Sequence, residues 1–171
     1  DSFCFQSAAH NVVEGVAACL GVPLVRRTWD GKSIDQSLNY SVTEGDEVEE
    51  LYELLREVLR RHPDVTAVSS GAILSTYQRT RVETCCKRLQ LTSLAYLWQR
   101  PQRQLLKDMS RSGLRAIVVK TATLGLEPED LGLELMARET RSRFDDLHDK
   151  YAFHVCGEGG EYESLVLDSP R

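Results

Sequence analysis

One short segment near the end of the chain concentrates residue types that can do chemistry. Residues 157–164 read Gly-Glu-Gly-Gly-Glu-Tyr-Glu-Ser, so three glycines and three carboxylates fall within eight positions. Glycine lets backbone amides approach a ligand closely, because it carries no side chain. Neighbouring carboxylates can hold an ammonium group, ligate a hard cation or accept a proton. A solvated hairpin turn is the plainer interpretation, but the apolar runs on both sides favour a binding turn.

The second candidate is the joint between an apolar run and a predicted helix at Val68–Ala72. Ser75 begins a capping-box pattern with Gln78, and a helix start offers free amides and a positive dipole to a phosphate. The joint holds a single glycine, so plain packing explains it about as well as nucleotide binding does. Arg79 and Arg81 follow in the first turns of the same helix, where they face either a cleft or solvent.

Other reactive side chains favour structural interpretations. His10 lies at a predicted helix start, where a lone histidine is usually structural or exposed. Tyr96 and Trp98 are expected to pack in the core, with lining of the cleft as the alternative for Trp98. The five cysteines form no CxxC pair and no zinc spacing, and no serine–histidine–acid order is present. Free thiols in a reducing cytosol fit this pattern best.

The candidate segments need elements to position them, and hydrophobic periodicity predicts a series of helices and strands. Apolar stripes with caps and stop signals predict helices at Ser7–Leu20, at Asp46–Arg61, from Ser75 onward, from Pro101 to Gly113 and from about Asp130 to Lys150. Short apolar runs predict strands at Pro23–Thr28, Val65–Ser69, Ser93–Trp98, Arg115–Val119, Tyr151–Val155 and Leu165–Asp168. Residues Trp29–Gly45 show no period and are predicted to form a long surface loop.

Strands that alternate with helices predict an α/β fold with a mostly parallel sheet covered on both faces. We expect a single domain over residues 1–171, because the length fits one domain and no repeat or linker interrupts it. Ligands of such sheets bind beyond the carboxyl ends of the strands. The turns that follow the strands should therefore share one edge of the molecule: Ser69–Ser75, Trp98–Pro101, Lys120–Gly125 and Gly157–Ser164.

Composition and charge exclude several classes of protein. Hydrophobic residues make up 42% and charged residues 27%, which are ordinary globular values. The net charge of -5 argues against general binding to nucleic acid. The longest apolar runs are far shorter than the roughly 18 residues that cross a bilayer. We therefore expect a soluble, cytoplasmic protein with no direct nucleic-acid or membrane partner.

Longer motifs go further than residue spacing. Ser70–Glu83 reads Ser-Gly-Ala-Ile-Leu-Ser-Thr-Tyr-Gln-Arg-Thr-Arg-Val-Glu, and His154–Glu163 reads His-Val-Cys-Gly-Glu-Gly-Gly-Glu-Tyr-Glu. Together with Glu44–Leu55 and Leu91–Arg100, these motifs closely resemble the diphthine–ammonia ligase family of N-type ATP pyrophosphatases. The resemblance keeps the family's order over nearly the whole chain. It implies a Rossmann-like sheet of the adenine nucleotide alpha hydrolase type.

The resemblance also implies an activity. Members of the family use ATP to add ammonia to the carboxyl group of diphthine, a modified histidine of translation elongation factor 2, and release AMP and pyrophosphate. The residues that would bind ATP, with Mg²⁺, are Ser70, Gly71, Ala72, Ser75, Gln78 and Arg81. The residues that would face diphthine and ammonia are Gly157, Gly159, Gly160, Tyr162, Glu163 and Ser164, with Glu158 and Glu161 as catalytic carboxylates. Our hypothesis is that one carboxylate holds ammonium and later accepts its proton.

Some features depart from the family pattern. Thr76 and Thr84 stand where Asp and Asn are expected, and Ser164 replaces Thr. The family's Ser-Gly-Gly-Lys-Asp-Ser loop, which holds the ATP phosphates, is not among these 171 residues, so we expect Asp1 to lie inside the domain and the sequence without that loop to lack ATP turnover. A catalytically inactive fragment or binding module of the same fold is one alternative. A transfer-RNA thiolase is another, which the acidic balance and the absence of CxxC disfavour.

Overall fold

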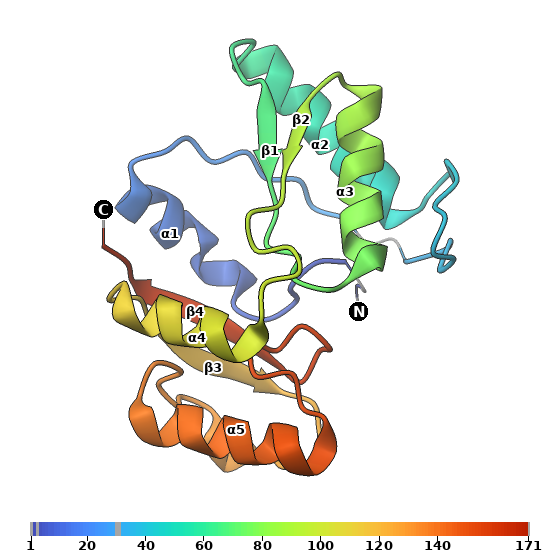
Figure 1. The fold of residues 1–171 in the computed structure, drawn as a ribbon. Coiled ribbons are helices and arrows are strands. Elements are labelled where there is room, and N and C mark those ends of the chain that lie inside the picture. Colours follow the sequence, from blue (N-terminus) through green and yellow to red (C-terminus); the bar gives the residue numbers. More distant parts are fainter. Residues whose placement is uncertain (1, 3, 30–31, 171) are drawn as a thin grey trace. The chain divides into compact units, whose positions relative to one another are not determined.

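The computed structural model describes residues 2, 4–29 and 32–170, and the chain divides into two compact units, Asp1–Trp98 and Gln99–Arg171. Each unit combines helices with a two-stranded sheet (Figure 1). The mixed α/β class is therefore confirmed. The single domain over residues 1–171 and the Rossmann-like sheet stay predictions, because one described strand pair is parallel and the other is antiparallel.

The first unit contains a parallel strand pair joined by a helix. Strands β1 (Ala67–Ser69) and β2 (Thr92–Leu94) pair with Ala67 opposite Thr92, and α3 (Thr76–Arg88) connects them. Helix α2 (Glu47–Arg61) packs against α3. The buried residues of this core are Val48, Leu55 and Cys85, and the partly buried ones are Tyr40, Leu51, Tyr52, Val68 and Leu89. Helix α1 (Val13–Leu20) follows the 3₁₀ turn η1 (His10–Val12).

Local signals explain where the helices of the first unit begin. The Asp46 side chain accepts a hydrogen bond from the backbone N–H of Val48 at 2.9 Å, which satisfies a free donor at the start of α2. Acidic residues in the first turn and Arg60 and Arg61 in the last turn complement the helix dipole. The Ser75 hydroxyl caps α3 in the same way. The helix starts predicted at Asp46 and Ser75 are thus confirmed.

The second unit is built on an antiparallel ladder. Strand β3 (Arg115–Thr121) pairs with β4 (Tyr162–Asp168). Residues 132–135 also run beside β3, through a 3.0 Å bond from Val118 N to Leu133 O. Helix α4 (Gln102–Arg111), the 3₁₀ turn η2 (Pro128–Asp130) and α5 (Arg138–Tyr151) complete the unit (Figure 1). Its buried core consists of Leu106, Ala116, Val118, Leu126, Leu135, Phe144, Phe153, Val155 and Tyr162.

Two predicted strands are wrong. Pro23–Thr28 forms no strand, because no described segment pairs with it in a ladder. Tyr151–Val155 forms no strand either, since α5 continues through Tyr151 and closes at Ala152, whose φ of 56° is left-handed. The backbone after Ala152 bonds to side chains in place of a neighbouring strand.

Several boundaries differ from the predictions. The first helix begins at Val13, because Ala9 is left-handed with φ of 60°. The second strand of the parallel pair ends at Leu94 and leads into a turn, and the last strand begins at Tyr162. The α-helix predicted from about Asp130 begins only at Arg138, because residues 132–135 pair with β3.

The predicted loop and the question of membrane-spanning helices remain to be compared with the structure. Asp1, and the residues Asp30 and Gly31 of the predicted loop, lie outside the described residues, while residues 32–45 carry no helix or extended strand. Among the described residues, no helix combines the length and apolar character that crossing a bilayer requires.

Candidate functional site

The glycine turn at residues 157–161 has a backbone shape that glycine makes possible. Gly157 has φ of +75°, and a Cβ placed on it would lie 3.0 Å from the carbonyl oxygen of Tyr162. Gly159 leaves space for a side chain of the turn, because a Cβ there would lie 2.7 Å from Oε1 of Glu161. The Gly157 N–H donates to the His154 carbonyl at 2.8 Å. The glycines therefore close the turn and leave room for the Glu161 carboxylate.

Surrounding groups hold the segment that leads into this turn. The Val155 N–H donates to Oε1 of Gln102 at 2.6 Å, and the Tyr162 hydroxyl donates to the Val155 carbonyl at 2.8 Å. At the far end of the turn, Ala122 N–H donates to the carbonyl of Glu161 at 3.0 Å. These hydrogen bonds connect the turn to α4, to β4 and to the residue that follows β3. The turn is therefore held in shape in the absence of a ligand.

The three carboxylates of the turn have different surroundings. Oε1 of Glu161 accepts a hydrogen bond from the His154 N–H at 2.9 Å, whereas Oε2 is buried and no described group donates to it. Glu163 forms an ion pair with Lys120 on the neighbouring strand, with 2.8 Å between Oε1 and Nζ. Glu158 is half-buried beside the ring of His154. An unsatisfied buried oxygen calls for an explanation, and a small donor ligand is one.

His154 belongs to this cluster, although the sequence prediction gave it no role. Its side chain is buried, and Nδ1 accepts hydrogen bonds from the backbone amides of Cys156 and Glu158. Burial lowers the pKa of the imidazole below its ordinary value, because the charged ring would lose its hydration. The carboxylates of Glu161 and Glu158 oppose this shift, and His148 adds to it. The neutral ring is the favoured form.

Tyr162 and Cys156 lie in or beside the core. Tyr162 stacks in an aromatic cluster with Phe153 and Phe144, at centroid distances of 6.1 and 5.3 Å. Burial raises the pKa of its hydroxyl well above the ordinary value. Burial also raises the pKa of the Cys156 thiol to about 12, so this thiol is protonated at neutral pH and is no nucleophile.

The residues predicted to bind the nucleotide lie in the first unit, at the carboxyl end of β1. The Ser70 N–H donates to the Leu94 carbonyl at 3.0 Å, which extends the parallel pairing by one residue. A Cβ placed on Gly71 would meet no atom within 4 Å, so packing does not require glycine there. The Ser75 hydroxyl accepts from the Gln78 N–H at 3.2 Å. The structure brings these residues together where α/β folds bind ligands.

Ala72 and Arg81 are buried, and Arg81 has a visible structural task. Its Nη2 donates to the carbonyl oxygens of Asp35 and Ser37, the latter at 3.1 Å. Its guanidinium carbon lies 3.2 Å from the ring centroid of Tyr77. Arg81 thus fastens the loop of residues 32–45 to α3, and its predicted contact with a nucleotide stays a prediction.

The remaining sequence candidates divide between surface and packing roles. His10 is exposed, in agreement with the prediction. Tyr96 is 74% exposed, so its prediction as a core residue is wrong. The Arg79 guanidinium lies 4.5 Å from the ring centroid of Trp98 and pairs with Glu83 at 2.6 Å. Arg79 therefore links the end of the Ser93–Trp98 segment to α3.

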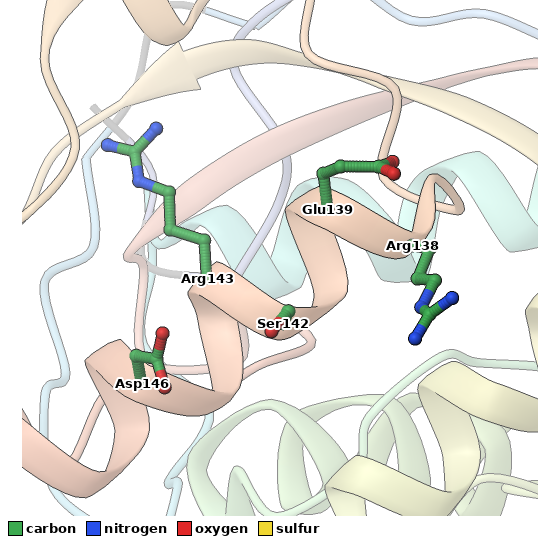
Figure 2. A pocket seen from close by; sticks show the side chains of 5 residues that line it. All are labelled: Arg138, Glu139, Ser142, Arg143 and Asp146. Atoms are coloured by element: carbon green, nitrogen blue, oxygen red, sulfur yellow. The ribbon is translucent and has the colours of Figure 1, made fainter.

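Two hollows lie away from the residues assigned to the nucleotide and to the glycine turn, although His10 lines the first of them. One, of about 620 Å³, lies in the first unit between the segment before α1 and the start of α2, but its Arg26 and Arg27 already pair with Glu14 and Glu50. The other, of about 400 Å³, is a shallow hollow along α5. It is lined by Arg138, Glu139, Ser142, Arg143 and Asp146. Figure 2 shows the guanidinium groups of Arg138 and Arg143 pointing away from one another, so they do not converge on one anion.

Metal binding was left open by the sequence. Within residues 2, 4–29 and 32–170, no three side chains of the His, Cys, Asp and Glu types gather closely enough to hold an ion by themselves.

The structure thus adds three residues to the predicted set around the turn: His154, Lys120 and Gln102. His154 carried a weak signal, since it stands three residues before the first glycine of the turn. Lys120 and Gln102 carried none, because they come from other elements far away in the sequence.

Comparison with known proteins supplies the family. The description "Diphthamide synthase N-terminal domain" matches residues 1–93, and "Diphthamide synthase C-terminal domain" matches residues 101–171. The gap between the two matched ranges includes the boundary between the two compact units.

Curated relatives agree with these matches. The diphthine–ammonia ligase of Schizosaccharomyces pombe is 54% identical over 170 residues, which are 99% of this chain and 28% of that protein. Those of Danio rerio and Homo sapiens are 50% and 48% identical over 99% of this chain, which spans 66% and 63% of their lengths. With one family description covering more than half of its residues, the chain belongs to the diphthamide synthase family of diphthine–ammonia ligases.

Proposed function

We propose that the protein amidates diphthine on translation elongation factor 2, using ATP and ammonia and releasing AMP and pyrophosphate. The observation that carries this proposal is the identity of about half of all positions, over nearly the whole chain, with proteins named for this reaction. The site of action would be the cytoplasm, where the elongation factor works. The activity is proposed for the full-length protein.

The chemistry requires an activated carboxyl group. A carboxylate does not react with an amine at neutral pH, because oxide would have to leave. Transfer of the AMP moiety from ATP to the carboxylate oxygen expels pyrophosphate and gives an acyl adenylate. Ammonia then attacks the carbonyl carbon, AMP leaves with the electron pair of the broken C–O bond, and the new nitrogen loses a proton. The protein has to position these reactants and accept that proton.

We assign ammonia to Glu161. The support is the buried Oε2 oxygen, for which no described donor exists, while Oε1 is fixed by the His154 N–H. Ammonium offers four N–H donors and is small enough for a covered position. Glu158, half-buried beside the same ring, is the second carboxylate and completes the negative charge that favours a cation. Glu163 is paired with Lys120 and is assigned to positioning.

The nucleotide would bind at the carboxyl end of β1. Ser70, Gly71, Ser75 and Gln78 lie there together, and Gly71 faces open space, so a phosphate or ribose can approach its backbone. The finer fold assignment, a Rossmann-like sheet of the adenine nucleotide alpha hydrolase type, belongs to this proposal. Mg²⁺ would come with the ATP phosphates, which commonly supply several of its ligands. No step is assigned to protein ligands of that ion.

The test is an amidation assay with the full-length protein. Elongation factor 2 carrying diphthine, ATP and ammonium are supplied, and AMP release and conversion of the carboxylate to the amide are followed by mass spectrometry. The wild type should form both products in equal amounts. Glu161→Gln and Glu158→Gln should each abolish amidation and keep the fold, because glutamine retains the shape and loses the negative charge.

The matched control is Glu129→Gln, which removes one charge from an exposed glutamate of the same unit. It should amidate at the wild-type rate. Normal turnover in both variants of the turn would refute the assignment of the two carboxylates. An inactive wild type would refute the function itself.

A further inference from the structure

The imidazole of His154 lies among the hydrogen bonds that shape the glycine turn. Its Nδ1 lies 3.3 Å from the amide nitrogen of Cys156 and 3.4 Å from that of Glu158. Both amides can only donate, so Nδ1 must carry a lone pair. The proton of the neutral ring must therefore lie on Nε2.

The surroundings of the ring favour this neutral form. The side chain is 9% exposed, and Nε2 is buried with no described partner. The titratable groups that face the ring are Glu158 and Glu161 from the turn and His148 from α5. Nδ1 of His148 lies 2.7 Å from the Phe153 carbonyl oxygen, to which it can only donate. The two carboxylates attract a proton to His154, but burial outweighs them.

Residue 154 also touches the other side of the turn. Its backbone N–H donates to Oε1 of Glu161 at 2.9 Å, while its ring accepts from the amide of Glu158. One residue therefore contacts both proposed catalytic glutamates: its backbone N–H donates to the Glu161 carboxylate, and its ring accepts from the backbone amide of Glu158.

We propose that His154 is a positioning residue for the proposed amidation: its neutral imidazole holds the amides of Cys156 and Glu158 and so fixes the two carboxylates of the turn. The inference rests on the proposed function. A proton on Nδ1 would face two N–H donors, so both hydrogen bonds would break together. The turn would then lose its shape, and Glu158 and Glu161 would leave their present positions.

The pH dependence follows from the same geometry. The folded-state pKa of His154 lies below its ordinary value of 6.5, since burial disfavours the cation. The contribution of the ring to the turn is therefore fully present above pH 6.5 and is lost as the pH falls through the lower, folded-state pKa. Amidation should show an acid limb in this range, caused by loss of the turn.

Two substitutions separate this role from general folding. In His154→Asn the side-chain oxygen takes about the place of Nδ1 and accepts the same amides, but it does not titrate in this range. In His154→Ala no acceptor remains. We expect the alanine variant to lose about tenfold or more in kcat, because two hydrogen bonds of ordinary strength are gone. The asparagine variant should recover most of that loss, and its acid limb should be absent.

Measurements without substrate test the positioning role on its own. In the full-length protein at neutral pH, ¹⁵N NMR of the imidazole should find Nδ1 unprotonated. Hydrogen exchange at the amides of Cys156 and Glu158 should be faster in the alanine variant and near the wild-type rate in the asparagine variant. If the alanine variant also loses protection in β3 and β4, the whole unit is destabilised and this variant does not isolate the turn. The test of the positioning role then rests on the comparison of the asparagine variant with the wild type.

Two results would overturn the inference. One is a proton on Nδ1 in the resting protein, and the other is an alanine variant with wild-type amide protection and an unchanged pH profile. A wild type that shows the expected NMR and exchange pattern but no amidation would refute the proposed function and leave the role of His154 in the turn supported.

Discussion

The substitution Gly159→Ala tests the position of the Glu161 carboxylate without changing any charge. The new Cβ would lie 2.7 Å from Oε1 and 3.1 Å from both Cδ and Oε2 of Glu161. Ordinary contact begins near 3.4 Å, so the carboxylate or the turn must move by about 0.7 Å. Backbone strain plays no part, because the φ of Gly159 is not positive.

The magnitude follows from the hydrogen bond that this movement disturbs. The His154 N–H donates to Oε1 of Glu161 at 2.9 Å, and a shift of about 0.7 Å away from the donor stretches it beyond bonding range. A hydrogen bond to a charged group contributes about 1.5–3 kcal/mol, and Glu161 is only half-buried. We therefore expect a loss of about 1–2 kcal/mol in the free energy of unfolding. Because displacement of a catalytic group by about 1 Å costs on the order of 100-fold in rate, amidation should fall much further than stability.

The assay combines three measurements on the full-length protein. Urea unfolding gives the change in stability, hydrogen exchange at the His154 amide reports the disturbed bond, and AMP release gives the rate. The control is Gly15→Ala in α1, where a Cβ meets no atom within 4 Å. It should stabilise the protein by about 0.5–1 kcal/mol and leave the rate unchanged. Wild-type turnover and wild-type protection of the His154 amide in Gly159→Ala would refute the reasoning.

Two further predictions concern the neighbours of the turn. Lys120→Met breaks the ion pair with Glu163, in which the lysine side chain is 40% exposed and the glutamate side chain 20%. In thermal unfolding the melting temperature should fall by no more than about 4 °C, while the rate of amidation should drop clearly. An unchanged rate would show that Glu163 needs no partner. Phe144→Ala removes a ring from the buried core of the second unit, where Phe144 is 0% exposed and its ring centroid lies 5.0 Å from that of Phe153. Urea unfolding should show that the free energy of unfolding falls by about 3–5 kcal/mol. A fall of less than about 1 kcal/mol would contradict the packing described.

Local signals made part of the fold predictable. The helix expected at Asp46–Arg61 appears as α2 with Asp46 as its cap, because capping residues and an apolar stripe lie within the helix itself. The end of α5 was not predictable in this way. Ala152 takes a left-handed conformation that usually signals glycine, and side chains of Gln102 and Tyr162 satisfy the backbone of Val155 in place of a strand. An apolar run therefore looked like a strand.

The sequence proposes the residue types of the candidate site but not the groups that these residues contact. The glycine and glutamate pattern pointed to the turn, but Lys120 stands 43 positions before Glu163, and Gln102 stands 53 positions before Val155. Such contacts depend on how the strands and helices pack, which spacing along the chain does not record. Arg81 is a further example, because the loop carbonyls that it contacts come from far away in the sequence. Its contact with a nucleotide stays a prediction.

The surroundings of Glu163, the third glutamate of the segment, follow from strand geometry. Side chains alternate along a strand, so burial of Tyr162 in the core directs Glu163 to the opposite face of β4. Lys120 is directly opposite Glu163 in the ladder and offsets its charge. In the proposed reaction Glu158 and Glu161 would bind the cation, while Lys120 offsets the charge of the third carboxylate. We propose that this arrangement favours ammonium as the bound form, and that loss of its proton to one of these two glutamates releases the nucleophile.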